Sequence, residues 1–224
     1  MSALPARLLR GLLTATIVVG IIGVGRQRTE AAAVRRGTLT PASAAADIPP
    51  RRPPGALGRR LGSWVPSRPT TPPGRIAAAV WAGPMTLIGF VLALLAGRRP
   101  RWDAELDCFV ARGVGGVSAA ALRSVGADAN TIGQVVLSRR DEPPASLLAH
   151  ETVHVRQTER LGPTMIVAYA WLAARYGYRD HPFERAARLG ARQVAQSSSA
   201  SSGSARDRPS SDTGPDRPSS DAGR

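Results

Sequence analysis

Apolar residues gather in two long runs in the first half of the chain. The first run, residues 8–25, reads LLRGLLTATIVVGIIGVG and contains one charge, Arg10. Its uncharged part, residues 11–25, is shorter than the about 20 residues that cross a bilayer. A short apolar run close to an N-terminus is typical of a signal-sequence core or a signal anchor. We therefore expect residues 1–25 to be a membrane-directed segment that resembles a signal anchor.

The second run, residues 76–96, reads IAAAVWAGPMTLIGFVLALLA and carries no charge. A helix of this length can cross a hydrocarbon core about 30 Å thick, and the arginines that flank it can reach the headgroups. Pro84 is tolerated more readily in a membrane helix than in a soluble one. The run predicts a transmembrane helix over 76–96, with a buried core helix as the alternative. Arginines are equally frequent on both sides, so the side of the membrane that the following domain faces stays open.

Two further segments lack any sustained apolar period. Residues 26–75 are rich in arginine, proline and alanine, a composition typical of a disordered linker. After Val194 the chain turns to serine, aspartate and arginine, and DRPSSDTG recurs as DRPSSDAG. This segment has no apolar side chain larger than alanine, so we expect residues 195–224 to be a disordered tail.

The remaining residues, 97–194, alternate between strand-like and helix-like patterns. ELDCFV (105–110) and TIGQVVLS (131–138) favour strands because they are short and rich in β-branched or apolar residues. Three helices are expected after them, at 146–161, 165–175 and 182–195. The sequence predicts an α+β fold, a mostly helical domain with a small sheet.

The basic charge of the chain is concentrated near its N-terminus. Residues 1–75 contain 12 arginines and two acidic residues, within a formal net charge of +14. This region is nearly free of aromatic residues and matches no nucleic-acid-binding module, so membrane lipid is a more natural partner for it than nucleic acid. A disordered flank that is basic without binding either partner is the favoured alternative. The single cysteine, Cys108, excludes an intrachain disulfide and a zinc site built from cysteines.

The histidines point to a metal. The chain has three, and two of them stand four residues apart in AHETVHVRQTERLGP, residues 149–163. Residues at that spacing share one helix face, so His150 and His154 can both reach a Zn²⁺ ion at about 2.0–2.1 Å. Glu151 lies beside the ion and is angled away from it, where a carboxylate can take a proton from a metal-activated water.

A third ligand is expected from RYGYRDHPFERAARLGAR, residues 175–192. Zinc sites with two histidines and one glutamate take the glutamate from a following helix, which favours Glu184. His181 is the alternative third ligand. The residue before a proline has extended backbone, which makes its side chain harder to direct toward the ion. A peptidase also needs a donor for the oxyanion; Tyr178 is our candidate, and Tyr169 is the alternative.

HETVHVRQTERLGP followed by YRDHPFERA resembles a set of small bacterial membrane-anchored proteins. These carry H-E-x-x-H-V-R-Q-x-E-R-x-G-P and then Y-R-D-N-P-F-E, and they are similar to minimal gluzincin-type zinc metallopeptidases. The resemblance covers residues 76–192. It implies a zincin-like fold, with His150, His154 and Glu184 as Zn²⁺ ligands and Glu151 as the general base. Residues 134–138 would then be an edge strand that pairs with an extended peptide substrate.

The chain departs from that pattern at three positions. His181 stands in place of an asparagine, Gln134 in place of a histidine and Ala186 in place of an acidic residue. The last change would remove one of the groups that orient the metal ligands. Weak or absent catalysis is therefore an alternative.

The leading hypothesis is a zinc-dependent peptidase anchored in a bacterial cell membrane and acting on a peptide or protein substrate. A catalytically silent zinc-binding domain tethered to the membrane is the alternative. In a third interpretation the arginine-rich N-terminus is itself the functional tether. The substrate and the oligomeric state stay open.

Overall fold

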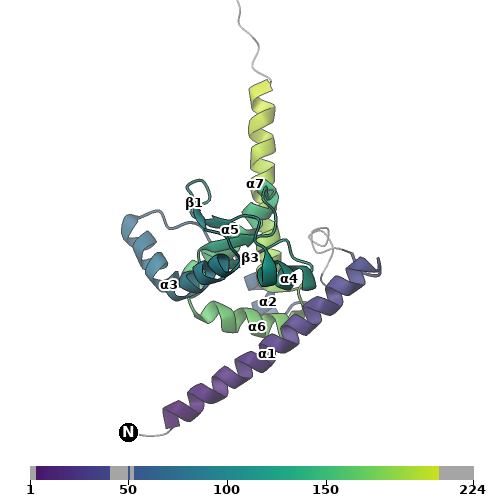
Figure 1. The fold of residues 1–224 in the computed structure, drawn as a ribbon. Helices are drawn as coiled ribbons and strands as arrows, with labels where there is room; N and C mark the ends of the chain where they lie inside the picture. The colour runs from purple at the N-terminus through teal and green to yellow at the C-terminus, as the bar shows by residue number, and fades with distance from the viewer. Residues whose placement is uncertain (1–3, 41–49, 51–52, 207–224) are drawn as a thin grey trace, which may run out of the picture.

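The computed structural model describes residues 4–40, 50 and 53–206. Its seven helices and four strands follow one another along the chain in this order: α1 (Leu4–Arg35), α2 (Ala56–Gly62), α3 (Pro72–Leu95), β1 (Arg101–Asp103), β2 (Cys108–Ala111), α4 (Gly116–Ser124), β3 (Ala129–Ile132), β4 (Val135–Ser138), α5 (Ala145–Leu161), α6 (Thr164–Tyr176) and α7 (Pro182–Arg206) (Figure 1). The predicted α+β class is confirmed: the fold is mostly helical, with one small mixed sheet.

The sheet has the strand order β1-β2-β4-β3. β1 pairs antiparallel with β2, β2 pairs parallel with β4, and β3 pairs antiparallel with β4. β4 is therefore an inner strand. The expectation that residues 134–138 form an edge strand for a substrate was wrong, because both sides of β4 are already hydrogen-bonded to neighbouring strands. The edge strands are β1 and β3.

A turn divides the run that the sequence predicted as one strand, 131–138. Ile132 pairs with Val135, so Gly133 and Gln134 form a two-residue hairpin loop. Gly133 has φ +66°, the left-handed backbone that glycine adopts without strain at the first position of a type II′ turn. Thr131 and Ile132 before the turn and Val135 to Leu137 after it are β-branched or apolar, which is why the segment suggested a single strand.

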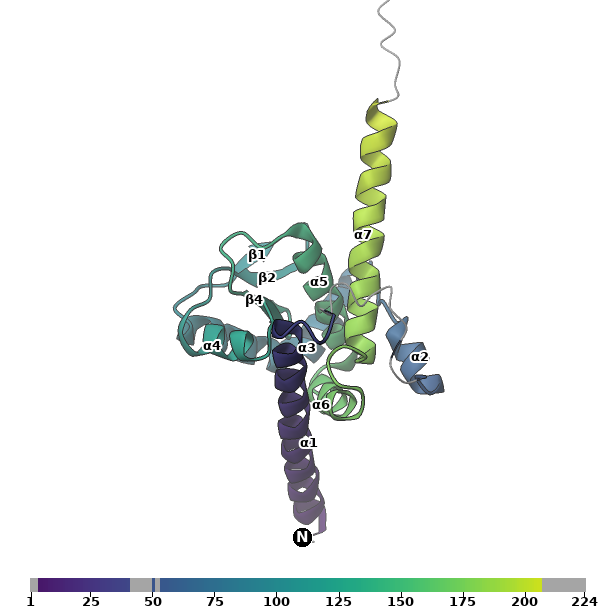
Figure 2. The same cartoon turned by 90° about the vertical axis from the view of Figure 1, so that its right-hand side faces the viewer.

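Alternating side chains of the strands enter two separate cores, as the two-residue period of a strand requires. On one face Ala111, Val135 and Leu137 pack with side chains of α3 and α4. On the other face Val110 and Val136 pack against α5 through Val155. The sheet is therefore a single layer between α3 and α4 on one side and α5 on the other, and α7 packs against α5 (Figure 2).

Close contacts of small residues fix α3 to the sheet. A Cβ atom on Gly89 would lie 2.5 Å from the carbonyl oxygen of Ile132, and a Cβ atom on Gly133 would lie 2.2 Å from the backbone nitrogen of Thr86. The Thr86 hydroxyl accepts a hydrogen bond of 3.0 Å from the backbone N–H of Gln134. Neither contact leaves room for a Cβ atom, so glycine is required in the helix at position 89 and in the hairpin at position 133. The backbones of α3 and of the hairpin can therefore lie in direct contact.

Within the described ranges, α3 is the one helix whose length and composition would allow it to cross a membrane. About a fifth of its most apolar window, 22%, is buried inside the molecule. A core helix or a signal sequence can share these properties, so the helix alone is weak evidence for a membrane. It does show that the apolar run predicted over 76–96 is helical and largely exposed.

The N-terminal part of the chain is more regular than the sequence predicts. We expected no regular structure for residues 26–75, but α1 continues to Arg35 and α2 forms at Ala56–Gly62. α1 packs against α6, and the Arg26 guanidinium donates to the carbonyl oxygens of Ala174 and Arg175. These carbonyls lie at the C-terminal end of α6, where the helix dipole favours a cation.

The last helix is also longer than expected. α7 was predicted to end near residue 195 and instead continues to Arg206. Serine and alanine are compatible with a helix, and the next proline is Pro209. The predicted disorder of residues 207–224, like that of 41–49, lies outside the described residues.

Candidate metal centre

α5 carries the paired histidines on its inner face. The helix begins at Ala145, one residue before the predicted start, because Pro143 and Pro144 end the preceding extended segment. It ends at Leu161 and is followed by Gly162, which has a φ of +55°. The rings of His150 and His154 have centroids 5.0 Å apart, as expected for side chains one helical turn apart.

Glu184 reaches the same point from α7. Pro182 occupies the first position of this helix, where the missing N–H costs nothing, and Glu184 follows in the first turn. Its Oε2 atom lies 3.2 Å from Nε2 of His150, and its Oε1 atom lies 3.2 Å from Nε2 of His154. The structure thus brings His150, His154 and Glu184 together, with one ligand atom from each within 4.8 Å of the others.

This trio fits a metal ion in both chemistry and spacing. Ligand atoms around a tetrahedral Zn²⁺ at about 2.0–2.1 Å lie about 3.3 Å from one another, close to the two histidine–glutamate distances of 3.2 Å. The Oε2 atom of Glu184 is buried and has no hydrogen-bond partner. A buried carboxylate oxygen that lacks a donor is costly, and a cation bound between these atoms would remove that cost.

The side chains of Gln157 and Tyr169 orient two of the ligand residues through hydrogen bonds. The Nδ1 atom of His154 lies 2.9 Å from Oε1 of Gln157, which is an acceptor. Nδ1 therefore donates to Gln157 in either protonation state, which leaves Nε2 facing Glu184, where it carries a second proton or binds a metal ion. The hydroxyl of Tyr169 donates a hydrogen bond of 2.8 Å to Oε1 of Glu184.

The electrostatics of the trio favour a positive charge between its members. Burial lowers the pKa of His154, but the Glu184 carboxylate outweighs burial and raises this pKa from 6.5 to about 9. Burial likewise raises the pKa of Glu184, while His154 and His150 hold it well below its ordinary range. The site without metal therefore holds a proton that a divalent cation would displace.

His181 faces away from the trio. The backbone N–H of Phe183 donates to Nδ1 of His181 over 3.2 Å, so the proton of the neutral ring lies on Nε2, which donates to the carbonyl oxygen of Tyr169 over 3.1 Å. Burial lowers the pKa of His181 to about 4, and the ring stacks on Tyr169 with centroids 4.2 Å apart. Both ring nitrogens are occupied, so the side chain acts as a cap for the start of α7.

Glu151 lies beside the trio, and its carboxylate is hydrogen-bonded to the sheet. Its Oε2 atom accepts a hydrogen bond of 2.7 Å from the hydroxyl of Thr131 on β3. Its charge is near enough to raise the pKa of His154. Burial and the charges of Glu184 and Glu151 raise the pKa of Tyr178 well above 10, so the Tyr178 hydroxyl keeps its proton close to both carboxylates.

Sequence reasoning missed Thr131, Gln157 and Arg188. Arg188 is buried one turn after Glu184, and its guanidinium donates to the carbonyl oxygen of Arg179. The spacing of three residues from His154 to Gln157, and of four from Glu184 to Arg188, places each pair on one helix face and could have identified both. No local signal marks Thr131, because it approaches Glu151 only through the pairing of the sheet.

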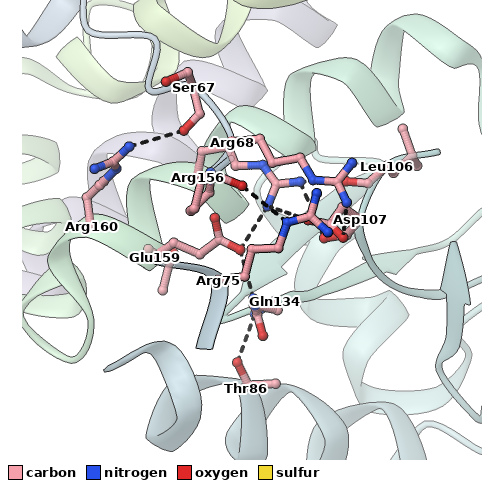
Figure 3. Close-up of polar contacts among 12 residues, drawn as sticks. Ser67, Arg68, Arg75, Thr86, Leu106, Asp107, Gln134, Arg156, Glu159 and Arg160 are labelled. Atoms are coloured by element: carbon pink, nitrogen blue, oxygen red, sulfur yellow. Dashed lines mark hydrogen bonds and ion pairs between the residues drawn. The ribbon is translucent and has the colours of Figure 1, made fainter. Parts of the chain in front are cut away.

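A second buried polar network holds α5 against the rest of the domain (Figure 3). The guanidinium of Arg156 donates to Glu159 over 2.8 Å and to the carbonyl oxygen of Leu106 over 2.7 Å. Asp107, the one described non-glycine residue with a positive φ, lies between Arg156 and Arg68. The network fixes the loop between β1 and β2 on the side of α5 that carries Arg156.

Two departures from the resembled pattern have structural explanations. Gln134 donates a hydrogen bond of 2.7 Å to Glu159 in this second network, so it lies in the scaffold and not in the trio. Ala186 is fully buried. In this chain Gln157 and Tyr169 are the residues that form hydrogen bonds to His154 and Glu184.

Part of this domain matches a known family. Residues 110–162 match the model of the eCIS core domain, a domain of extracellular contractile injection systems that contains an HExxH-like zinc-metallopeptidase motif. The segment runs from β2 to the end of α5, so it contains His150, Glu151 and His154 and stops short of Glu184. We found no match among curated proteins and none among solved structures.

Proposed function

We propose that this chain is a membrane-attached, zinc-dependent peptidase of the gluzincin-like kind. The observation that carries the proposal is the convergence of His150, His154 and Glu184 from two helices, with the carboxylate of Glu151 beside them. The match to the eCIS core domain supports it, because the matched segment carries the HExxH motif.

The chain's own groups divide the work of hydrolysis. His150, His154 and Glu184 would hold the ion, and a bound Zn²⁺ supplies a Lewis acid that acidifies water and polarises a carbonyl oxygen. Glu151 removes a proton from the water that attacks the peptide carbonyl and later returns it to the leaving amine. Thr131 fixes the carboxylate of Glu151 through Oε2. The protonated hydroxyl of Tyr178 is the donor for the developing oxyanion.

An extended peptide would bind along β3. This strand is an edge of the sheet, and the bond from the Arg139 N–H to the Asp128 carbonyl oxygen continues its pairing with β4. Hydrogen-bonded pairs alternate along an antiparallel ladder, so the backbone groups of Ala129 and Thr131 point away from β4. A substrate strand paired there lies next to Glu151, to which the Thr131 side chain is bonded.

Replacing Glu151 tests catalysis separately from metal binding. We expect Glu151→Gln to keep the fold and the bound zinc, because the amide can still accept the hydrogen bond from Thr131. Peptide turnover should fall by about a hundredfold or more, since general-base catalysis contributes roughly 10²–10⁴-fold. Turnover that is unchanged at equal zinc content would show that Glu151 is not the base.

The second candidate is a catalytically silent zinc domain that serves as an interaction module. Limited access favours it: the side chain of His150 is 16% exposed, that of His154 9% and that of Glu184 4%. In that case no peptide is cleaved by the zinc-loaded wild-type chain, while removing zinc lowers its thermal stability. Turnover that depends on both zinc and Glu151 excludes this candidate.

A further inference from the structure

The outward face of α3 is apolar from Ile76 to the end of the helix. Val80, Leu87, Val91, Leu94 and Leu95 are each between 47% and 79% exposed. The buried residues of the same helix, Ala78, Ala82, Met85, Gly89 and Ala93, recur every three or four positions on the opposite side. The helix is thus apolar all round, with one side on the domain and the other without a partner in the described chain.

The contacts on its buried side prevent α3 from crossing a bilayer alone. Thr86 is hydrogen-bonded to the hairpin, Gly89 lies against the carbonyl oxygen of Ile132, and the indole of Trp81 packs at Gly162. If α3 stood upright in the hydrocarbon, the sheet and α5 would enter it with the helix. Arg160, which is exposed and lies next to Ala77, Ala78 and Trp81 of α3, would then face lipid at membrane depth, where a charge costs several kcal/mol.

A groove of positive character lies where α3 ends. It has a volume of about 520 Å³ and is lined by Arg98, Arg99, Arg101 and Arg112, with Trp102, Asp103 and Asp141 among its other residues. Arg98 and Arg112 form long ion pairs with the two aspartates, of 3.7 and 3.5 Å, while Arg99 and Arg101 are exposed. The indole of Trp102 is half exposed, and tryptophan is enriched where protein meets the bilayer interface.

We propose that this face docks on an anionic bilayer with α3 lying along the surface. The outward apolar side chains enter the boundary between headgroups and acyl chains, as in other interfacial helices. The arginine groove receives the phosphates of anionic lipids at the end of the helix. This inference refines the membrane attachment of the proposed function, and its test does not depend on whether the centre cleaves peptides.

Thiol labelling distinguishes docking from crossing. Thr70→Cys and Ala104→Cys are introduced together in the full chain; both positions are exposed and lie on either side of α3. The protein is added to preformed phosphatidylglycerol–phosphatidylcholine vesicles, floated with them and treated with an impermeant maleimide. Docking predicts two labels per chain before detergent is added. Cys108 is fully buried and burial raises its pKa to about 12, so the wild-type chain is the unlabelled control.

One label per chain before detergent and two after it would show that α3 crosses the bilayer, and the proposal would fall. Failure of the chain to float with the vesicles would overturn it too.

Charge variants test the groove. Arg99→Gln with Arg101→Gln should weaken binding to the anionic vesicles about thirtyfold, since each arginine near the surface contributes about 1 kcal/mol. Binding to pure phosphatidylcholine should hardly change. Arg60→Gln with Arg123→Gln removes the same net charge at exposed positions outside the groove and is the matched control. An equal loss of binding in both pairs would mean that net charge, and not the groove, attracts the lipid.

Discussion

Glu184 is surrounded by groups that set its position before any metal binds. Tyr169 donates to one carboxylate oxygen, and the other faces His150. Gln157 fixes the tautomer of His154 from the far side of the ring. The ligand atoms of Glu184 and His154 are therefore positioned by polar neighbours, as is usual in metal sites.

Removing one hydroxyl tests this support. We expect Tyr169→Phe to weaken zinc binding about tenfold, the lower end of the range for groups that orient metal ligands, because Glu184 loses its 2.8 Å hydrogen bond. Competition with a zinc chelator measures the change. Tyr176→Phe, on the same helix, removes a hydroxyl that lies next to Gly58 and should leave the affinity unaltered. An unchanged affinity in Tyr169→Phe would mean that the hydroxyl does not position Glu184.

His181 makes the stability of the fold sensitive to acid. Its pKa is lowered from 6.5 to about 4 by burial, so the unfolded chain takes up a proton at a pH where the folded chain does not. Its contribution is complete above pH 6.5 and is lost as the pH falls from 6.5 to 4, by up to about 3 kcal/mol.

Asparagine at this position separates the cap from the titration. In His181→Asn the amide oxygen can still accept from the Phe183 N–H, as at other helix N-caps. We therefore expect a fold that persists and a free energy of unfolding that depends less on pH between 6.5 and 4. Urea denaturation across this range measures both proteins. Parallel curves would show that His181 does not titrate as described.

At the scale of elements, α3 packs against the β3–β4 hairpin at backbone contact distance. Two glycines of α3 differ sharply in their surroundings: a Cβ atom on Gly89 would lie 2.5 Å from the Ile132 oxygen, whereas Gly83 has nothing within 4 Å. Their substitution compares the same chemical change in two environments of one helix.

We expect Gly83→Ala to change the free energy of unfolding by less than about 1 kcal/mol, because the gain in helix propensity is opposed by contact of the new Cβ atom with the following Pro84. Gly89→Ala has the same gain in propensity but forces α3 away from the sheet, and a net loss of about 1–3 kcal/mol should result. Chemical denaturation of both variants provides the measurement. Similar effects at the two positions would contradict the close packing of α3 on the hairpin.

The N-terminal helix is coupled to the loop that carries Tyr178. Oε2 of Glu30 accepts hydrogen bonds of 3.0 Å from the backbone N–H groups of Tyr178 and Arg179. Without this carboxylate two amides lose their acceptor, so Glu30→Ala should accelerate hydrogen exchange at both residues. Arg28→Ala, at an exposed position of the same helix, should leave exchange there unchanged. If Glu30→Ala also has no effect, α1 does not hold this loop.

The ligand-bearing elements were predictable because their signals are local. The four-residue spacing of His150 and His154, the glycine after α5 and the proline that starts α7 all act within one helical turn. The sheet was harder to predict. β1 is three residues long, and only Gly133 and Gln134 separate the two strands of the hairpin, so the segments on either side resemble one strand. The inner position of β4 depends on pairing with β2, which no property of residues 131–138 reveals.

At the scale of the whole molecule, the helices and strands form two parts, a supporting scaffold and the candidate metal centre. The sheet, α3 and the network around Arg156 form a rigid support, while α5 and α7 meet at their inner faces to form the centre. Glu184 lies beyond the segment that matches the eCIS core domain, so the complete trio depends on a helix outside that match.

Zinc content in three proteins tests the central claim most directly. We expect the wild-type chain and His181→Asn each to bind one zinc ion per chain, because His181 faces away from the trio, while Glu184→Ala should bind almost none. Metal analysis after dialysis against a weak chelator gives the stoichiometry, with circular dichroism to establish that each variant is folded. Full zinc content in folded Glu184→Ala, or its loss in folded His181→Asn, would contradict a centre built from His150, His154 and Glu184.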